Sequence, residues 1–219
     1  ESAPFLVRLS SGDELLARAV VDASGTWRTP NPLGATGLPA PGERQAAVAG
    51  LIGVPLPDVL GAGRSHHAGK RTLVVGAGHS AANTLIDLVR LAEETPGTTV
   101  QWAIRGRSPV RVYGGGSVDA LPGRGALGTR LRALVESGRI ALLTDFRVHR
   151  VVEDGGHVVV IGRDSDGNER KVITDRIVAA TGFRPDHSLA TELRLDVDPV
   201  LSAARTLAPL IDPNEHSCG

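Results

Sequence analysis

The sequence predicts an α/β fold built on a central βαβ unit with a β-rich second half. Three observations support this fold class. Residues 71–75 (RTLVV) form an apolar, β-branched run, residues 80–94 carry apolar side chains at helical spacing, and residues 100–104 (VQWAI) form a second apolar run. Together they cover about thirty residues, the length of one strand–helix–strand unit.

The other elements are assigned from turn residues and periodicity. Residues 5–9 and 14–22 flank the turn SSGD and predict a β-hairpin, and the Gly-, Pro- and Ala-rich residues 25–69 predict an extended connection. Pro96-Gly97 ends the central helix. A second helix is predicted at 126–137, and short strands at 139–143, 146–153, 157–162 and 170–180, with turns at 155–156 and 167.

Composition restricts the class of protein. The chain has 219 residues, 41% of them hydrophobic, and equal numbers of basic and acidic residues, as expected for a globular protein with neither a nucleic-acid nor a membrane partner. The single cysteine, Cys218, excludes an intrachain disulfide and a CxxC site. We expect a cytoplasmic protein acting on a small molecule. Because the chain lacks methionine even at position 1, we also expect a fragment or a processed chain.

A glycine-rich motif joins the first strand of the βαβ unit to its helix. Residues 76–81 (GAGHSA) fit the pattern GxGxxA. Gly76 permits a tight turn, Gly78 lets a pyrophosphate approach the backbone, and Ala81 allows the helix to pack close to the strand. The helix N-terminus adds unpaired N–H groups and a partial positive charge.

The motif therefore predicts a Rossmann-like dinucleotide site. Its cofactor-binding residues are predicted to be Gly76, Ala77, Gly78, His79, Ser80 and Ala81. Ser80 can add a hydroxyl donor, whereas His79 either contacts a phosphate or ribose or is simply exposed. The alternative is a glycine-rich α/β turn that holds no ligand.

The residues after the second strand distinguish NADP from NAD. An NAD site has Asp or Glu there for the ribose hydroxyl, and an NADP site has Arg for the 2′-phosphate. This chain has Arg105, Arg107 and Arg111 and no carboxylate in that stretch. We predict NADP(H) binding with Arg105 as the leading contact, although exposed arginines are common in an Arg-rich chain.

A weak internal repeat flanks the βαβ unit. Residues 12–30 and 167–185 both contain a turn, an apolar run and small residues closing on glycine, namely Ala23-Ser24-Gly25 and Ala180-Thr181-Gly182. With the GxGxxA motif between them, the sequence resembles the two-dinucleotide-domain flavoproteins, which include flavin-containing monooxygenases, Baeyer–Villiger-type monooxygenases and thioredoxin reductases. In these proteins an inserted NADPH domain interrupts an FAD domain, and such strands mark the two crossings.

The resemblance implies a domain organisation. Residues 1–45 would be a remnant of the FAD domain with a crossing linker, residues 46–178 the NADP(H)-binding domain, and residues 179–219 the return crossing and the start of a C-terminal FAD-domain segment. Ala180, Thr181 and Gly182 would then contact cofactor. No FAD-binding glycine turn precedes residue 76, and neither the CxxC of thioredoxin reductases nor the monooxygenase fingerprint is recognisable.

The resemblance also implies a function. The chain would be the NADP(H)-binding part of a flavin-dependent oxidoreductase, either monooxygenase-like or a reductase, that positions NADPH for hydride transfer to FAD. The alternative is a stand-alone nucleotide-binding or sensing domain without turnover. No catalytic residue and no metal site is predicted, and His66 and His67 are interpreted as loop residues. Trp102 is predicted to lie in the core, and Trp27 and Phe183 either to pack or to shape a cofactor pocket.

Overall fold

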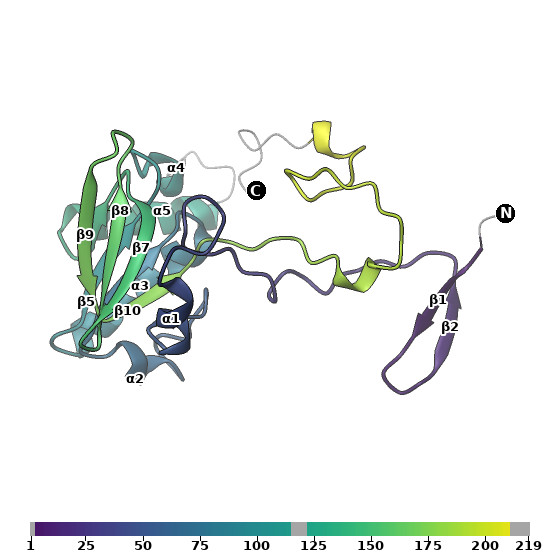
Figure 1. The fold of residues 1–219 in the computed structure, drawn as a ribbon. Coiled ribbons are helices and arrows are strands. Elements are labelled where there is room, and N and C mark those ends of the chain that lie inside the picture. Colours follow the sequence, from purple (N-terminus) through teal and green to yellow (C-terminus); the bar gives the residue numbers. More distant parts are fainter. Residues whose placement is uncertain (1–2, 115–121, 211–219) are drawn as a thin grey trace. The chain divides into compact units, whose positions relative to one another are not determined.

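The chain divides into two compact units. A computed structural model describes residues 3–114 and 122–210. The first unit combines Glu1–Thr29 with Phe183–Gly219, and the second unit is Pro30–Gly182 (Figure 1). These boundaries come from the packing of the chain, and the assignment of each region to a cofactor domain stays a prediction.

A five-stranded parallel sheet forms the centre of the second unit. Its strands are β3 (Ile52–Gly53), β4 (Arg71–Val75), β5 (Thr99–Ala103), β6 (Ala141–Leu143) and β10 (Arg176–Ala179), in the order β3-β10-β4-β5-β6. Every pairing is parallel. Because both faces are covered, strand β4 is apolar almost throughout. The structure thus confirms the predicted α/β class and the βαβ unit.

Helices cover one face of this sheet. Helix α3 (His79–Glu94) follows β4, and α5 (Pro122–Glu136) packs against α3. Leu85, Leu88 and Leu91 of α3 are fully buried, and they share one core cluster with Val74 and Trp102 of the sheet. The helix ends before Pro96-Gly97, as predicted. The short helix α4 (Val110–Tyr113) also borders this core.

An antiparallel layer covers the other face. Strands β7 (Arg147–Asp154), β8 (His157–Arg163) and β9 (Glu169–Thr174) pair in chain order (Figure 1). Val148, Val151, Val158, Val160 and Val172 from this layer pack with Leu73, Val75 and Ile177 of the parallel sheet. Leu73 and Val75 of β4 therefore pack against the antiparallel layer, whereas Val74 between them packs against the helices. This is the alternation of side chains that a strand requires.

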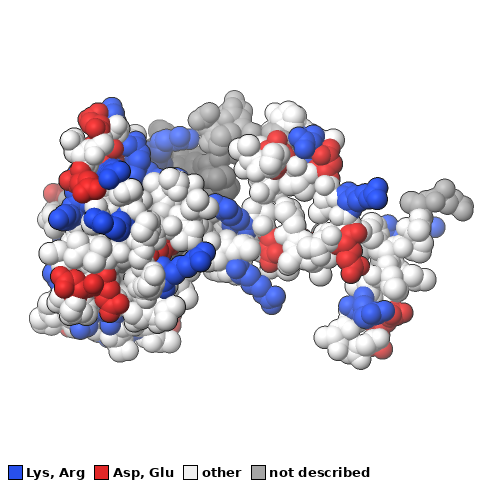
Figure 2. Space-filling model, in the orientation of Figure 1, with Lys and Arg blue, Asp and Glu red and all other residues white. Residues whose placement is uncertain are grey.

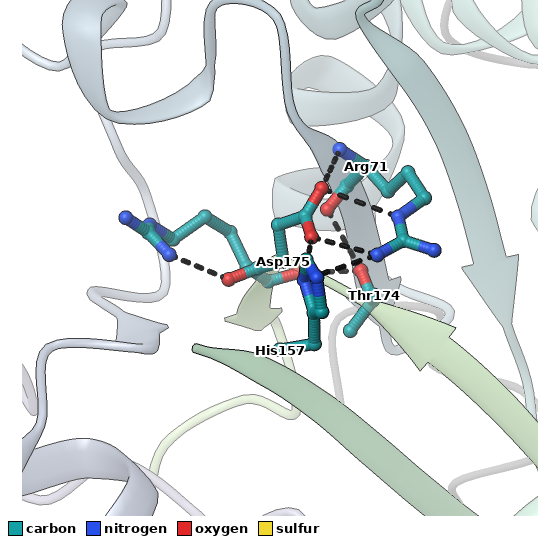
Figure 3. A network of polar contacts seen from close by, with 5 residues as sticks. Arg71, His157, Thr174 and Asp175 are labelled. Carbon is teal, nitrogen blue, oxygen red and sulfur yellow. Dashed lines mark hydrogen bonds and ion pairs between the residues drawn. The ribbon is translucent and has the colours of Figure 1, made fainter. Parts of the chain in front are cut away.

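The structure corrects the prediction of one strand over residues 170–180. The run is divided at Asp175 into β9 and β10, which belong to different sheets. Asp175 accepts hydrogen bonds from the backbone N–H and the guanidinium of Arg71, at 2.8 Å and 2.8–3.2 Å, and lies 2.6 Å from Nδ1 of His157 (Figure 3). These hydrogen bonds, led by that of the Arg71 guanidinium, hold the pKa of the Asp175 carboxyl well below its usual range. The chain thereby turns from the antiparallel layer into the parallel sheet.

The predicted extended connection at residues 25–69 also needs correction. It contains α1 (Glu43–Val48), β3 and α2 (Arg64–His67). The side chain of Glu43 is buried and accepts hydrogen bonds from the backbone N–H groups of Leu33, Gly34 and Ala40. The buried carboxylate of Glu43 holds this segment in place by accepting hydrogen bonds from three backbone N–H groups. The Gly, Pro and Ala content of residues 25–69 does not reveal these contacts.

The first unit contains little regular structure. Strands β1 (Phe5–Arg8) and β2 (Glu14–Ala17) form the predicted hairpin. However, β2 ends at Ala17 and not at Asp22, because Ala17 pairs with Phe5, the first residue of β1, and β1 offers no partner beyond it. The two copies of the weak repeat consequently differ, since Val20-Val21 lies outside any strand whereas Ile177-Val178 lies in β10. Two short 3₁₀ turns, η2 (Ser188–Ala190) and η3 (Ala208–Leu210), complete the described part.

Candidate nucleotide-binding site

The glycine turn, residues Gly76–Gly78, lies where the strand order of the parallel sheet reverses. From β4 the chain continues through β5 to β6 on one side, and it then returns to place β10 on the other side of β4. Strands β4, β5 and β10 are parallel, so their carboxyl ends share one edge, called here the carboxyl edge. Open α/β sheets bind ligands at such a reversal point, at the carboxyl ends of the strands.

Gly76 is held by two hydrogen bonds with the neighbouring strand β5. Its N–H donates to the carbonyl of Ala103 at 3.1 Å, and its carbonyl accepts from Nε1 of Trp102 at 2.7 Å. With φ at 139°, a Cβ on Gly76 would lie only 2.0 Å from the carbonyl oxygen of Ala180. The protein itself therefore requires glycine at this position.

Gly78 differs from Gly76 because the surrounding protein makes no demand on it. Its φ of −92° is accessible to any residue, and a Cβ there would meet nothing within 4 Å. Ala77, Gly78 and His79 are exposed, and no side chain among the described residues caps the N-terminus of α3. The start of the helix is therefore open, and its first-turn N–H groups are available to an anion.

The remaining motif residues begin the helix. Ser80 is half-buried, and Ala81 is fully buried in the core between α3 and the sheet. His79, the first helical residue, is exposed. The structure brings the six motif residues together at the carboxyl edge, and their contacts with a nucleotide stay a prediction.

The three predicted arginines have different surroundings. Arg105 follows β5, is exposed, and makes no hydrogen bond or ion pair with the described residues. Arg107 donates to the Ser165 hydroxyl and lies 3.6 Å from the Asp145 carboxylate. Arg111 is exposed on α4. Of the three, Arg105 has the guanidinium that a phosphate could bind without displacing a protein partner.

Asp145 is a residue near this edge that the sequence interpretation missed. It follows β6, its N–H donates to the carbonyl of Gly106, and its carboxylate accepts from the N–H and hydroxyl of Ser165. The hydrogen bonds from Ser165, followed by the charges of Arg147 and Arg107, lower the pKa of Asp145. Its position after the predicted strand 139–143 was the available signal, because neighbouring parallel strands end at one edge.

The residues after β10 are bound to the segment that enters the second unit. The Thr181 hydroxyl donates to the carbonyl of Asn31 at 2.6 Å, and the Asn31 side chain donates back to the carbonyl of Thr181 at 3.2 Å. The N–H of Asn31 donates to the carbonyl of Gly182. Ala180 borders Gly76, but the hydroxyl of Thr181 already has a protein partner.

Other sequence interpretations have mixed outcomes. Trp102 is fully buried, as predicted, and Trp27 packs edge-on against Phe183 in the first unit with ring centroids 5.3 Å apart. His67 is not a loop residue. It ends α2, is buried, and lies 3.2 Å from the hydroxyl of Thr72 through Nδ1. Cys218 lies outside the described residues.

The described residues contain neither a metal-binding cluster nor a membrane-spanning helix. In 3–114 and 122–210, no three or more His, Cys, Asp or Glu side chains are grouped so that they could hold a metal ion. No helix in the same ranges is long and apolar enough to cross a membrane. Figure 2 shows basic and acidic side chains interspersed over the visible face of the second unit.

Together these features define a Rossmann-like fold: an open parallel sheet, a glycine turn at the point of strand reversal, and a helix that follows the turn. No family model matches the chain, and no curated protein matches it. Its relationships are therefore visible only in the fold.

Two solved reductases and one solved monooxygenase share this fold. Bacillithiol disulfide reductase of Bacillus cereus matches 89% of this chain with 21% identity and a TM-score of 0.57, and thioredoxin reductase of T. acidophilum matches 85% with 20% identity and a TM-score of 0.57. The cadaverine monooxygenase DfoA of Erwinia amylovora, solved with bound FAD, matches 93% with 15% identity and a TM-score of 0.60.

These matches confirm the predicted Rossmann-like α/β fold. The chain spans about half the length of these proteins, covering 50%, 51% and 59% of the two reductases and the monooxygenase respectively.

Proposed function

We propose that the second unit binds NADP(H) at the carboxyl edge, with the pyrophosphate on the glycine turn and the N-terminus of α3. In the whole protein, the nucleotide would be positioned there for hydride transfer to FAD in an oxidoreductase reaction. The hydride chemistry belongs to the two cofactors, and the contribution of this chain is binding and orientation.

The environment of Gly78 is the observation that carries this proposal. Gly76 needs to be glycine because a Cβ would strike Ala180, whereas Gly78 has an ordinary backbone conformation and open space around it. Glycine at an exposed helix start is less favourable than a capping Ser, Thr, Asn or Asp in entropy and hydrogen bonding. A ligand that approaches the backbone closely gives a physical reason for glycine at this position.

The choice of NADP(H) over NAD(H) rests on Arg105. A guanidinium binds a phosphate through two parallel charge-assisted hydrogen bonds, and Arg105 has no described partner to lose. Asp145 is the carboxylate near this edge, but its oxygens already face Ser165, Arg107 and Arg147. It is therefore poorly available to a ribose hydroxyl, the group that an NAD site would bind.

The involvement of FAD is supported by the fold and by the surface of the first unit. The three solved proteins are oxidoreductases, and one contains FAD. The first unit exposes large apolar side chains, including Leu16, Val21 and Val200, which are 73%, 89% and 87% exposed. Apolar side chains exposed in such numbers are typical of a surface that packs against further protein or a ligand.

The proposal is tested by calorimetric titration of NADPH and NADH into the wild-type chain and two glycine variants. Gly78→Ala places a methyl group where the pyrophosphate would lie, so we expect NADPH to bind about tenfold more weakly or worse. Gly123→Ala is the matched control, because a Cβ on Gly123 also meets nothing within 4 Å. The control should bind NADPH as the wild type does.

Two results would contradict the nucleotide site: a wild-type chain that does not bind NADPH, or a Gly78→Ala variant that binds it as tightly as Gly123→Ala does. The flavin part is tested separately by adding FAD and following visible flavin absorption on addition of NADPH. Flavin reduction on addition of NADPH would support the oxidoreductase role over a stand-alone nucleotide-binding domain.

A further inference from the structure

Trp102 makes a specific contact with the glycine turn. The residue lies on β5, is fully buried, and donates from Nε1 to the carbonyl oxygen of Gly76 at 2.7 Å. No other described side chain forms a hydrogen bond with Gly76, Ala77 or Gly78. The turn therefore has one side-chain anchor, which comes from the strand next to it.

This contact fixes the direction of a peptide group. The carbonyl of Gly76 and the N–H of Ala77 belong to the same trans peptide, so they point in opposite directions. Because the carbonyl is held inward by Trp102, the N–H of Ala77 faces away from the core, and Ala77 itself is exposed. The Gly76–Ala77 peptide cannot rotate without losing its hydrogen bond to Trp102 on β5, and the preceding peptide is held separately by the hydrogen bond from the N–H of Gly76 to Ala103.

The packing requirement alone does not explain an indole at this position. Phe or Leu would also fill an apolar core, and a buried indole N–H adds a donor that must find a partner. Here that donor is used on the turn and not elsewhere in the core.

From this geometry we infer that Trp102 is a positioning residue of the nucleotide site, directing the N–H of Ala77 toward the pyrophosphate. The inference rests on the proposed function, because it assigns a role to Trp102 in that same site. The inferred role predicts that removing the indole N–H of Trp102 weakens nucleotide binding more than a substitution that only removes packing from the same core does.

The test compares Trp102→Phe with Leu131→Ala, a packing variant in the same core cluster. NADPH binding is measured by calorimetry, and exchange of the Gly76 amide hydrogen is followed by NMR without nucleotide. Trp102→Phe should raise the NADPH dissociation constant about tenfold and accelerate Gly76 exchange by a similar factor. Leu131→Ala should lower the melting temperature but change both quantities less than about twofold.

A second substitution guards against misfolding of Trp102→Phe. Benzothienylalanine has nearly the shape of tryptophan but lacks the N–H, and a Trp27→Phe background confines it to position 102. The same increases in the dissociation constant and in Gly76 exchange are expected with this isostere.

The two readouts separate the inference from the function on which it rests. If the isostere and Trp102→Phe affect NADPH binding no more than Leu131→Ala does, Trp102 is only a packing residue and the inference is wrong. If the wild-type chain does not bind NADPH, the proposed function fails and the role in nucleotide binding fails with it. The exchange of Gly76 would then still show whether Trp102 holds the turn.

Discussion

Replacement of Gly76 by alanine should strongly destabilise the second unit. The new Cβ would lie 2.0 Å from the carbonyl oxygen and 2.6 Å from the carbonyl carbon of Ala180, both of them backbone atoms. A φ of 139° is in addition a conformation that L-residues rarely adopt. Either the turn or the end of β10 must therefore move.

The expected loss of stability follows from these two effects. A strained backbone conformation costs about 1–3 kcal/mol, and overpacking of a tight contact costs about 1–3 kcal/mol more. We expect the free energy of unfolding to fall by about 4 kcal/mol, a large part of the ~5–15 kcal/mol typical of a domain. For a chain of this size the melting temperature should fall by about 8–16 °C.

Urea unfolding of the full chain in a Trp27→Phe background measures this loss. Trp102 is then the sole tryptophan, and its fluorescence reports on the second unit. Gly78→Ala is the control, because its backbone conformation and surroundings accept a methyl group, and it should change stability by less than about 1 kcal/mol. The reasoning is refuted if Gly76→Ala unfolds at the same urea concentration as Gly78→Ala.

Two further predictions concern Arg105 and His67. Arg105→Ala should weaken NADPH binding by about 1.5–3 kcal/mol and leave NADH nearly unchanged, and equal losses for both would count against the 2′-phosphate role. Arg107→Ala is its control, because Arg107 is paired with Asp145 and Ser165. Burial lowers the pKa of His67 from 6.5 to about 4, so the unfolded chain takes up the proton first as the pH falls. Stability should fall by about 3 kcal/mol between pH 6.5 and 4, and His67→Gln should remove this component in urea unfolding at each pH. A His67→Gln curve parallel to the wild type would contradict it.

The parts of the fold that were predicted correctly are those specified by local periodicity. The β4–α3–β5 unit has an apolar β-branched strand, a helical repeat of leucines and a Pro-Gly stop, all within one short stretch. The split of residues 170–180 depends instead on Asp175 accepting from Arg71, 104 residues earlier in the chain. No pattern within residues 170–180 contains that contact.

In the candidate site, too, features specified by local sequence were predicted, and features that depend on distant residues were not. The GxGxxA motif located the glycine turn, because Gly76 has a local backbone role and Ala81 a local packing role. The indole donor of Trp102, the bonds of Thr181 to Asn31 and the surroundings of Asp145 depend on residues brought together by the sheet. For that reason Trp102 was predicted only as a core residue, and Asp145 was missed.

The pairing of Asn31 with Thr181 and Gly182 has a consequence for engineering. The chain enters and leaves the second unit at positions joined by hydrogen bonds, so the two ends of this body lie beside each other. A unit with adjacent ends is suited to domain insertion into a loop of a host protein. It is also suited to circular permutation, in which a short linker joins the two ends and new termini are placed elsewhere in the unit.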